Sequence, residues 1–455
     1  MCRLVVVCRG RQAEVAVPAG VAVCDLLPAL LRHAGDDLAD ASQEHGGWVL
    51  QRLGGAPLDE DRTPAALGLR DGDIVMLSPR DEALPEMDFD DLADGIAMGI
   101  RARPDRWREE TTRKLLLGSA FAFLAAGWAV LVPAGSATPR AAAAGGAAAL
   151  LVLTGGVLER RLGDSTAGTM LGAASLPYAA LCGVLVSGDS SAVIRPGASG
   201  LLTAGCAALV TAVLALLLVE RSRPLFVGAA AVSAAVILGT LPLVAGWFTA
   251  TQSSAVLLAV ALVLAPALPM AAFRLTSLRV NVLPTGAEDL DEDIEPVPAE
   301  PLLEQVGVAD SFMTSLFCAI GVVCIVCLVR LLTVPGWAHT SLGVTGCVVL
   351  LLRSRVLLSA WQRLAALAPA ALGLLLFAVS LAARLPVGPR VAGELVGLLA
   401  AASLLVVGSR TLPGRRLLPY WGRAADLCET GAALSLIPLL FQVLGLYSYV
   451  HGLTG

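Results

Sequence analysis

Cysteine can act as a redox group or a metal ligand, and one pair of cysteines in this chain has the spacing of such a site. Cys324 and Cys327 are separated by two residues, and Cys318 precedes them. A metal site would need further Cys, His or acidic ligands, and a reactive thiol would need an electropositive, partly exposed setting. The neighbours are Ala, Gly, Ile and Val. We therefore interpret these cysteines as small hydrophobic residues and predict no metal site.

Acidic side chains are concentrated in one run of the C-terminal half, Glu288 to Glu295. The run lacks the glycine turn and the ligand spacing of an EF-hand loop, so calcium binding is not expected. We interpret it as part of a solvated acidic loop, at about residues 274–310, between two groups of helices. A docking strip for a basic partner is the alternative interpretation.

The acidic groups of the C-terminal part outside this loop lie at the ends of apolar segments, and His339 and His451 lie in segments expected outside the membrane. These acids are Glu159, Asp164, Glu220, Glu394, Asp426 and Glu429. Ion-coupled transporters and membrane enzymes keep such groups inside the membrane. We therefore predict no catalytic residue and no cofactor, and we do not expect an enzyme.

The composition excludes an ordinary soluble enzyme. Of 455 residues, 56% are hydrophobic and 15% are charged, and the mean hydropathy is +0.76. Soluble domains carry about 25% charged residues. The net charge of −5 leaves no large basic surface to neutralise phosphates, so a nucleic-acid partner is not expected.

Residues 1–82 predict a small α+β domain. Strand patterns at residues 4–8 and 14–18 form a hairpin, a helical pattern follows within 21–34, and strands are expected at 48–53 and 74–78. Pro28 restricts the helix to a start near Cys24 and Asp25. Hairpin, helix, strand, irregular stretch and strand is the order of a β-grasp domain. We expect this domain to stay cytoplasmic, since the N-terminus lacks the pattern of a signal peptide. We expect it to dock a cytosolic partner; the alternative is a domain that only caps the membrane part.

Residues 83–114 predict an amphipathic and basic linker. Phe89 and Leu92 begin the apolar face of a helix whose first turn is acidic. Arg103, Arg106 and Trp107 follow, and Arg113 stands just before a long apolar segment. Basic residues with a tryptophan ahead of an apolar span are typical of a membrane-surface anchor. We predict that these six residues contact the membrane surface, a partner protein, or both.

Residues 115–455 predict about eleven transmembrane helices, each of roughly 20 mostly apolar residues. The expected spans are about 115–132, 141–158, 166–187, 199–219, 225–244, 254–273, 311–332, 338–352, 364–383, 391–408 and 427–448. The eighth is the shortest. Arginines are more frequent in the loops on the side of the N-terminal domain, which predicts a cytoplasmic N-terminus and an outside C-terminus.

The order of these parts resembles the EccD family, the multi-spanning membrane component of actinobacterial type VII (ESX) secretion systems. The resemblance is carried by the turn Arg70-Asp71-Gly72-Asp73, by Phe89-Asp90-Asp91, by Arg103-Pro104 with Trp107, and by Thr112-Arg113. It implies an α-helical polytopic membrane protein of about 11 helices with an N-terminal ubiquitin-like β-grasp domain, located in the plasma (inner) membrane.

The resemblance also implies a function and partners. These are a non-enzymatic scaffold or channel subunit that assembles with EccB-, EccC- and EccE-like subunits, and a dimer that encloses lipid. EccC is an FtsK/SpoIIIE-like ATPase, and the N-terminal domain is expected to dock it. The alternative is a secondary transporter or permease with a regulatory β-grasp domain, which would need a polar site at the membrane midplane.

Overall fold

The fold is described in a computed structural model of the chain. The description covers residues 2–8, 11–34, 47–52, 56–80, 109–133, 135–188, 193, 196–276, 299–411, 419–447 and 449. These residues form two compact units, Met1–Thr111 and Thr112–Gly455, which are considered one at a time.

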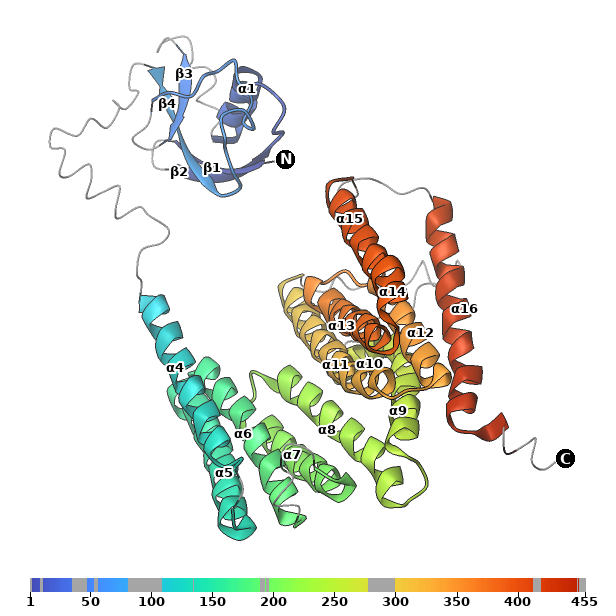
Figure 1. The fold of residues 1–455 in the computed structure, drawn as a ribbon. Helices are drawn as coiled ribbons and strands as arrows, with labels where there is room; N and C mark the ends of the chain where they lie inside the picture. Colours follow the sequence, from blue (N-terminus) through green and yellow to red (C-terminus); the bar gives the residue numbers. More distant parts are fainter. Residues whose placement is uncertain are drawn as a thin grey trace, which may run out of the picture. The chain divides into compact units, whose positions relative to one another are not determined.

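The first unit is a four-stranded mixed sheet crossed by one helix (Figure 1). Its elements are β1 (Cys2–Cys8), β2 (Arg11–Val17), α1 (Val23–Ala34), β3 (Trp48–Arg52) and β4 (Asp73–Pro79). The strand order is β2-β1-β4-β3, with β1 and β4 parallel and the other pairs antiparallel. This is the β-grasp arrangement that the element order predicts.

The turn Arg70-Asp71-Gly72-Asp73 fixes where β4 enters the sheet. The Asp73 carboxylate accepts a hydrogen bond from the Arg70 backbone N–H at 3.0 Å, and Gly72 has φ +88°, which glycine adopts without steric cost. The Arg3 N–H of β1 donates to the Asp71 carboxylate at 2.7 Å. The Arg70 N–H, with help from Arg52, lowers the pKa of Asp73 below its usual value.

Helix α1 buries one face on the sheet and begins one residue before the expected start. Leu26, Leu27, Leu30 and Leu31 are buried against strand residues such as Val75. Pro28 therefore lies in the second turn, where it cannot donate to the Cys24 carbonyl. The Val23 and Cys24 N–H groups bond to carbonyls of the 60–62 segment, so tertiary contacts hold the helix start in place.

The second unit consists of helices. Their bounds are α4 (Glu109–Val130), α5 (Ala137–Leu162), α6 (Ser165–Val186), α7 (Ala198–Leu218), α8 (Arg223–Val244), α9 (Ala250–Leu264), η3 (Ala265–Ala267), α10 (Leu268–Leu275), α11 (Ala299–Thr333), α12 (Trp337–Ser354), α13 (Ala360–Arg384), α14 (Val387–Pro389), η5 (Arg390–Leu395), α15 (Val396–Thr411) and α16 (Pro419–Val443). Among the described residues, ten helical segments are long and apolar enough to cross a membrane. The chain therefore has a helical polytopic membrane fold.

The eighth expected span corresponds to α12, which is not one of those ten segments. Its neighbours show that it nevertheless runs from one end of the bundle to the other. The Arg384 side chain at the end of α13 donates to the Val334 carbonyl just after α11 at 3.4 Å. The Arg363 side chain at the start of α13 donates to the Ser354 carbonyl at the end of α12 at 3.2 Å. With 18 residues, α12 is about 27 Å long, close to the roughly 30 Å of a hydrocarbon core.

Helix α11 differs from the expected boundary between loop and span. Residues 299–310, which we assigned to the acidic loop, continue the helix as its first three turns. Gln362 of α13 explains part of this, because its amide donates to Asp310 at 2.8 Å and to Thr314 at 3.1 Å and so ties this stretch to the bundle. Residues 288–295 lie outside the described residues.

Glycines allow the helices to approach each other at backbone distance. A Cβ on Gly155 of α5 would lie 2.9 Å from the Gly168 carbonyl oxygen of α6. A Cβ on Gly183 of α6 would overlap the Thr203 carbonyl of α7, and one on Gly321 of α11 would lie 2.5 Å from the Ala365 carbonyl of α13. In a membrane, where lipid is as apolar as leucine, such close packing is a main source of helix association.

We predict that Gly183→Ala lowers the thermal stability of the purified protein in detergent. The new methyl group must push α6 from α7, at a cost of about 1–3 kcal/mol. Gly146→Ala is the matched control, since a Cβ there meets nothing within 4 Å, and alanine is the better helix former. Equal melting temperatures for the two variants would contradict the close contact.

Candidate functional site: the charged end of the helical unit

Charged side chains of the second unit gather at one end of its helices, which we name the charged end. It is defined by the residues Arg113, Arg160, Asp164, Glu220, Arg353, Arg355, Asp426 and Glu429, which form ion pairs with one another. Because lipid offers no hydrogen bonds, a charge near the membrane must find its partner within the protein or in the boundary water.

Arg113 is the one residue of the six site residues from the sequence that the structure describes. Its guanidinium pairs with the Asp164 carboxylate at 2.7 Å, which ties the start of α4 to the N-cap of α6. Asp164 also accepts the Ala167 N–H at 3.0 Å. That N–H, together with Arg113, lowers the pKa of Asp164 against the opposing effect of desolvation. Contact of Arg113 with lipid or a partner stays a prediction.

The other five site residues predicted from the sequence, Phe89, Leu92, Arg103, Arg106 and Trp107, lie outside the described residues. Their predicted contacts with the membrane surface or a partner therefore stay predictions.

Helix α4 has no buried residue, but its partly buried Leu124 and Trp128 pack against an apolar cluster of α5 and α6. Single polar contacts add to this packing. Besides the Arg113 ion pair, the Trp128 indole N–H donates to the Pro177 carbonyl at 3.1 Å. The Tyr178 hydroxyl of α6 donates back to the Leu124 carbonyl at 2.7 Å. All three contacts join α4 to α6 or to its N-cap.

A second group joins α5 to α7 and to the turn between α7 and α8. The Arg160 side chain donates to the Leu217 carbonyl at 2.5 Å and pairs with Glu220 at 3.5 Å. The Glu159 carboxylate accepts the Arg221 backbone N–H at 2.6 Å. Arg160 and Glu220 are about half exposed, so this group is at the membrane boundary rather than in the core.

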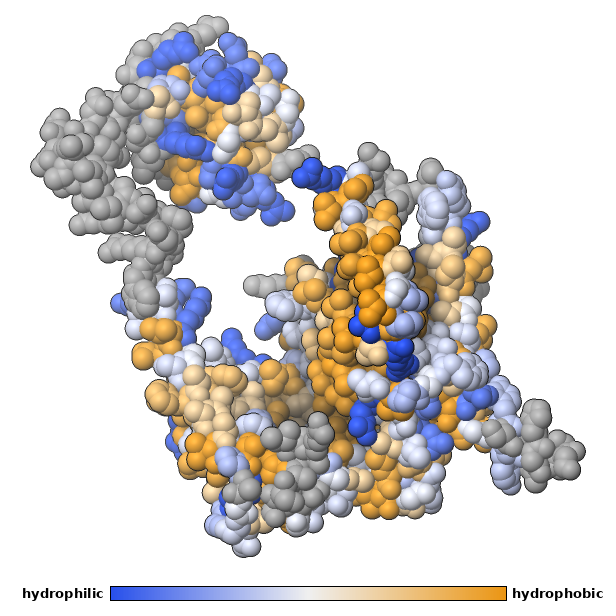
Figure 2. Space-filling view, viewed as in Figure 1, coloured by the Kyte–Doolittle hydropathy of each residue, from blue (hydrophilic) through white to orange (hydrophobic). Residues whose placement is uncertain are grey.

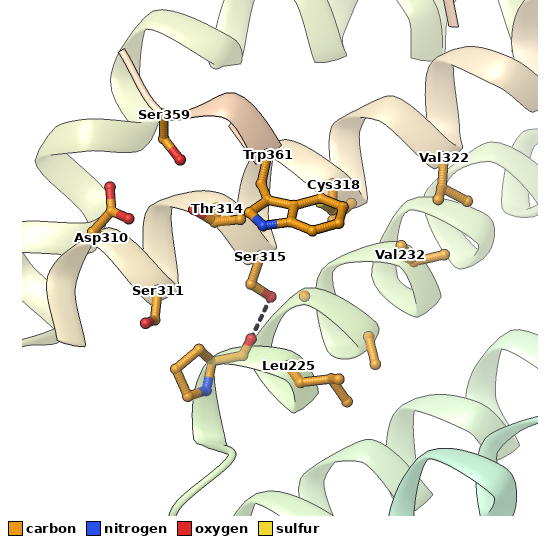
Figure 3. Close-up of a pocket in the computed structure, with 14 residues that line it drawn as sticks. Leu225, Val232, Asp310, Ser311, Thr314, Ser315, Cys318, Val322, Ser359 and Trp361 are labelled. Atoms are coloured by element: carbon orange, nitrogen blue, oxygen red, sulfur yellow. Dashed lines mark hydrogen bonds between the residues drawn. The ribbon is translucent and has the colours of Figure 1, made fainter. Parts of the chain in front are cut away.

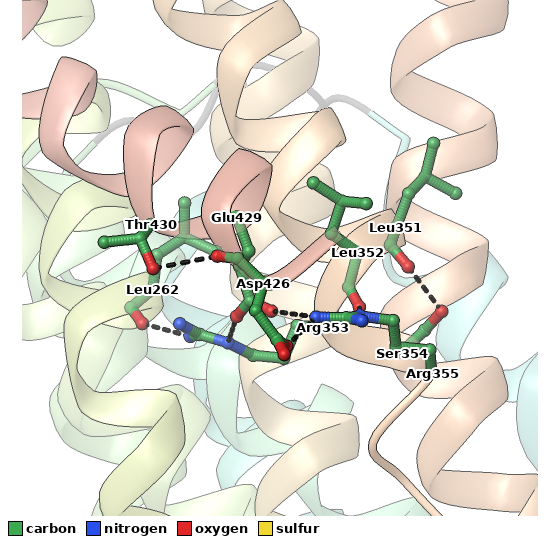
Figure 4. A network of polar contacts seen from close by, with 9 residues as sticks. All are labelled: Leu262, Leu351, Leu352, Arg353, Ser354, Arg355, Asp426, Glu429 and Thr430. Carbon is green, nitrogen blue, oxygen red and sulfur yellow. Dashed lines mark hydrogen bonds and ion pairs between the residues drawn. The ribbon is translucent and has the colours of Figure 1, made fainter. Parts of the chain in front are cut away.

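The least exposed ion pair joins α12 to α16. Its arginine also donates to a backbone carbonyl of α9 that has lost its helical donor. Arg353 pairs with Glu429 at 3.2 Å, and the two side chains are 17% and 19% exposed. The same guanidinium donates to the Leu262 carbonyl at 2.5 Å (Figure 4). Pro266, four residues after Leu262, has no N–H to offer that carbonyl. Arg353 therefore supplies the hydrogen bond that the proline removes.

Arg355 extends this network along the start of α16. It pairs with Asp426 and with Glu429, the latter at 3.6 Å, and donates to the Gly422 carbonyl at 3.1 Å (Figure 4). The two carboxylates are three residues apart on one helix, so both face α12. Two arginines and two acids neutralise each other here, and these contacts add to the apolar packing of α16 through Leu436 and Val443.

From the sequence, Asp426 and Glu429 are predicted only as ends of a span, and Arg353 and Arg355 count only among the loop arginines. A signal was present: Arg353-x-Arg355 ends one apolar segment, and Asp426-x-x-Glu429 begins another with the opposite charge. Which segments would meet is decided by the tertiary structure.

At the opposite end, arginines donate to backbone carbonyls that helix ends leave open. Arg140 donates to the Leu131 and Val132 carbonyls, each at 2.9 Å. Arg390 donates to the Leu385 carbonyl at 2.7 Å. These bonds complete the C-terminal ends of α4 and α13.

Tryptophans mark both boundaries of the apolar region. Trp361 and Trp421 stand at the charged end, at the starts of α13 and α16, and are 69% and 59% exposed. Trp247 and Trp337 stand at the opposite end and are 76% and 68% exposed. Exposed indoles at two levels are typical of the two membrane–water interfaces.

Between these levels the helices present an apolar surface. Figure 2 shows a broad hydrophobic area over α13 to α15. Helix α15 has no buried residue, and Leu404 and Leu405 are 71% and 75% exposed. Such a surface is stable when lipid or another apolar helix covers it.

Cys324 and Cys327 lie in the apolar core, as expected, whereas Cys318 is exposed. Cys324, Cys327 and Cys347 are at most 1% exposed and belong to one cluster with leucines of α11 and α12. Among the described residues, no three His, Cys, Asp or Glu side chains are grouped closely enough to hold a metal ion.

Comparison with known proteins gives two family matches. Residues 112–453 match the family described as "EccD-like transmembrane domain". Residues 1–77 match the family described as "WXG100 protein secretion system (Wss), protein YukD".

The chain is also similar to a curated protein and to solved structures. It is 28% identical to the "ESX-4 secretion system protein eccD4" of Mycobacterium tuberculosis (strain CDC 1551 / Oshkosh), over 99% of this chain and 97% of that protein. Two solved structures share the fold at 19% identity. "Structure of protomer 1 of the ESX-3 core complex" has a TM-score of 0.61 and covers 98% of this chain and 99% of its own. "MycP5-free ESX-5 inner membrane complex, State II" has a TM-score of 0.59 and covers 89% of this chain and 99% of its own.

We predict that Arg353→Met strongly destabilises the protein, because it removes the shorter of the two ion pairs of Glu429 and leaves the Leu262 carbonyl without its donor, at about 3 kcal/mol. Glu429 then keeps only Arg355, at 3.6 Å, which also pairs with Asp426. The double variant Arg353→Met with Glu429→Leu should recover part of this loss, since it removes the excess negative charge. Arg330→Met, an exposed arginine at the end of α11, is the control. Melting temperatures in detergent measure all three, and a double variant no better than Arg353→Met would contradict the ion-pair account.

Proposed function

Since this chain belongs to the EccD family, we propose that it is a non-enzymatic membrane scaffold of a type VII protein secretion complex in the plasma (inner) membrane. One observation carries the proposal. A YukD-like domain and an EccD-like transmembrane domain follow each other in one chain, over residues 1–77 and 112–453. The alignment with the relative named eccD4 covers 99% of this chain and 97% of that protein.

The described polar groups support a structural role rather than catalysis. Arg353 holds a proline-broken helix, Arg113 holds α4, and Arg355 holds α16. Each of these charges is used in a contact between helices, so the network assembles spans and offers no nucleophile next to a base.

The proposed partners are EccB-, EccC- and EccE-like subunits and a second copy of the chain. The similar solved structures are named as a core complex and an inner membrane complex, which supports assembly with other subunits. Helices α4 and α15 have no buried residue in the single chain, so their surfaces are available to lipid, to a partner helix or to a second copy. We propose self-association as a dimer.

We propose that the N-terminal domain docks the EccC-like ATPase. It has its own core, built from α1 and the four strands, and so folds without contribution from the spans. A folded domain outside the membrane is suited to hold a cytosolic motor, which would supply the energy that the scaffold does not.

We further propose that the charged end faces the cytoplasm, with the N-terminus inside and the C-terminus outside. Arginine is enriched in cytoplasmic loops, and the loops at the charged end carry Arg160, Arg161, Arg221, Arg223, Arg353, Arg355 and Arg363. The α12 geometry supports eleven crossings, which put the two termini on opposite sides.

Cysteine labelling tests this orientation. Leu358→Cys, at a residue that is 99% exposed between α12 and α13, should react with a membrane-impermeant maleimide only after cells are permeabilised. Pro335→Cys, between α11 and α12, should react in intact cells because α12 separates the two sites. The parent chain has cysteines of its own, so its labelling is measured in parallel and subtracted. Reaction of both sites on the same side would exclude α12 as a span.

Deletion of residues 1–82 tests the docking role. We expect unchanged amounts of protein in the membrane fraction but at least about a tenfold loss of ATPase subunit co-purified with it, equivalent to roughly 1.4 kcal/mol of binding. The melting temperature of the truncated chain serves as the control for intact spans. Full recovery of the ATPase with the truncated chain would refute docking through this domain.

A further inference from the structure

A cavity of about 550 Å³ lies between α8, α11 and α13 at the charged end (Figure 3). Its volume falls within the roughly 300–1,000 Å³ of small-molecule sites. The first half of α8, the middle of α11 and the N-terminal end of α13 form its walls. None of the ion pairs of the charged end involves its lining residues, so it is distinct from the network that joins the helices.

The lining changes from polar to apolar along α11. Asp310, Ser311 and Thr314 lie at one end of the cavity, whereas Cys318 and Val322 lie toward the other (Figure 3). At 1.5 Å per residue, Asp310 and Val322 are about 18 Å apart along the helix. The cavity therefore extends from the membrane boundary into the depth of the acyl chains, a polarity profile that matches a single phospholipid molecule.

Asp310 is the one charged residue among the described lining residues. Its carboxylate accepts one hydrogen bond, from the neutral Gln362 amide at 2.8 Å. Asp164, Glu220, Asp426 and Glu429 at the same end each have an arginine partner, and Asp310 forms no ion pair with any described residue. A carboxylate at the membrane boundary is stabilised by a cation, so the ligand should bring a positive charge.

Hydrogen-bond donors remain for an acidic group next to that cation. The Ser311 and Ser315 hydroxyls donate to the Gly307 and Pro224 carbonyls and are used. The Ser359 hydroxyl makes no cap bond, and the Trp361 indole, which is 69% exposed, lies over the cavity (Figure 3). Neither side chain donates to another described residue, so both can donate to phosphate oxygens.

We propose that this cavity binds a phospholipid with an ammonium headgroup, of the phosphatidylethanolamine type. The ammonium group pairs with Asp310, the phosphate accepts from Ser359 and Trp361, and an acyl chain lies along Leu225, Val232 and Val322. Phosphatidylglycerol offers no cation to Asp310 and brings an uncompensated negative charge, so it should bind more weakly.

Competition between the two lipids tests the proposal. The full chain, purified in detergent and stripped of lipid, is mixed with equal amounts of phosphatidylethanolamine and phosphatidylglycerol of the same chains, and bound lipid is counted by native mass spectrometry. We expect a preference of about fivefold for phosphatidylethanolamine, the size of one boundary ion pair. Equal binding, or a preference for phosphatidylglycerol, would overturn the proposal.

Variants assign the preference to this cavity. Asp310→Asn keeps an acceptor for Gln362 but removes the charge, and should abolish the preference. Glu304→Gln, an exposed acid on the same helix outside the cavity, should leave it unchanged. Val322→Trp fills the deep part and should reduce binding of both lipids. An unaltered preference in Asp310→Asn would place the lipid elsewhere.

A soluble headgroup separates a lipid from a small zwitterion. Glycerophosphoethanolamine, which lacks acyl chains, should not displace bound phosphatidylethanolamine at equal concentration, because the apolar part of the cavity contributes to binding. Displacement by the soluble compound would refute the assignment to a lipid.

Discussion

The absence of water in the bilayer is the constraint on which the transmembrane unit depends. A carbonyl or a charge that faces lipid has no solvent partner, so the protein must supply one. The Leu262 carbonyl, which loses its helical donor to Pro266, receives the Arg353 guanidinium from another helix. The charge on that guanidinium then needs Glu429. One proline just after α9 is thereby associated with contacts among α9, α12 and α16, which are distant in sequence.

The same constraint explains why the middle of the unit is so different from its ends. Where charges are absent, helices are joined by surface shape, and glycines such as Gly155, Gly183 and Gly321 let backbones meet. Burial of Cys324, Cys327 and Cys347 belongs to this apolar middle. The ion pairs lie at the membrane boundary, where tryptophans also lie. In the interior, close packing of the helices takes their place.

Membership of the EccD family and this distribution of charge support the same view of the protein. A scaffold must hold many spans in fixed order and present separate surfaces to its neighbours. The ion pairs of the charged end hold the spans in order. We propose the sheet domain as the surface for a motor, the exposed α4 and α15 as surfaces for other subunits, and the amphipathic cavity beside α11 as a surface for lipid.

Local sequence determined the elements, because their signals are local. Alternating residues gave the strands of the first unit, the Arg70-Asp71-Gly72-Asp73 turn gave the entry to β4, and apolar length gave the spans, including the short α12. The tertiary structure decided which elements contact each other. The first turns of α11 were expected in a loop, since Asp310 and Glu304 make that stretch polar, but Gln362 from α13 binds it. The pairing of Arg353 and Arg355 with Asp426 and Glu429 joins residues more than 70 positions apart. The sequence shows that each stands at the end of an apolar segment, but which ends become neighbours depends on how the helices pack around one another.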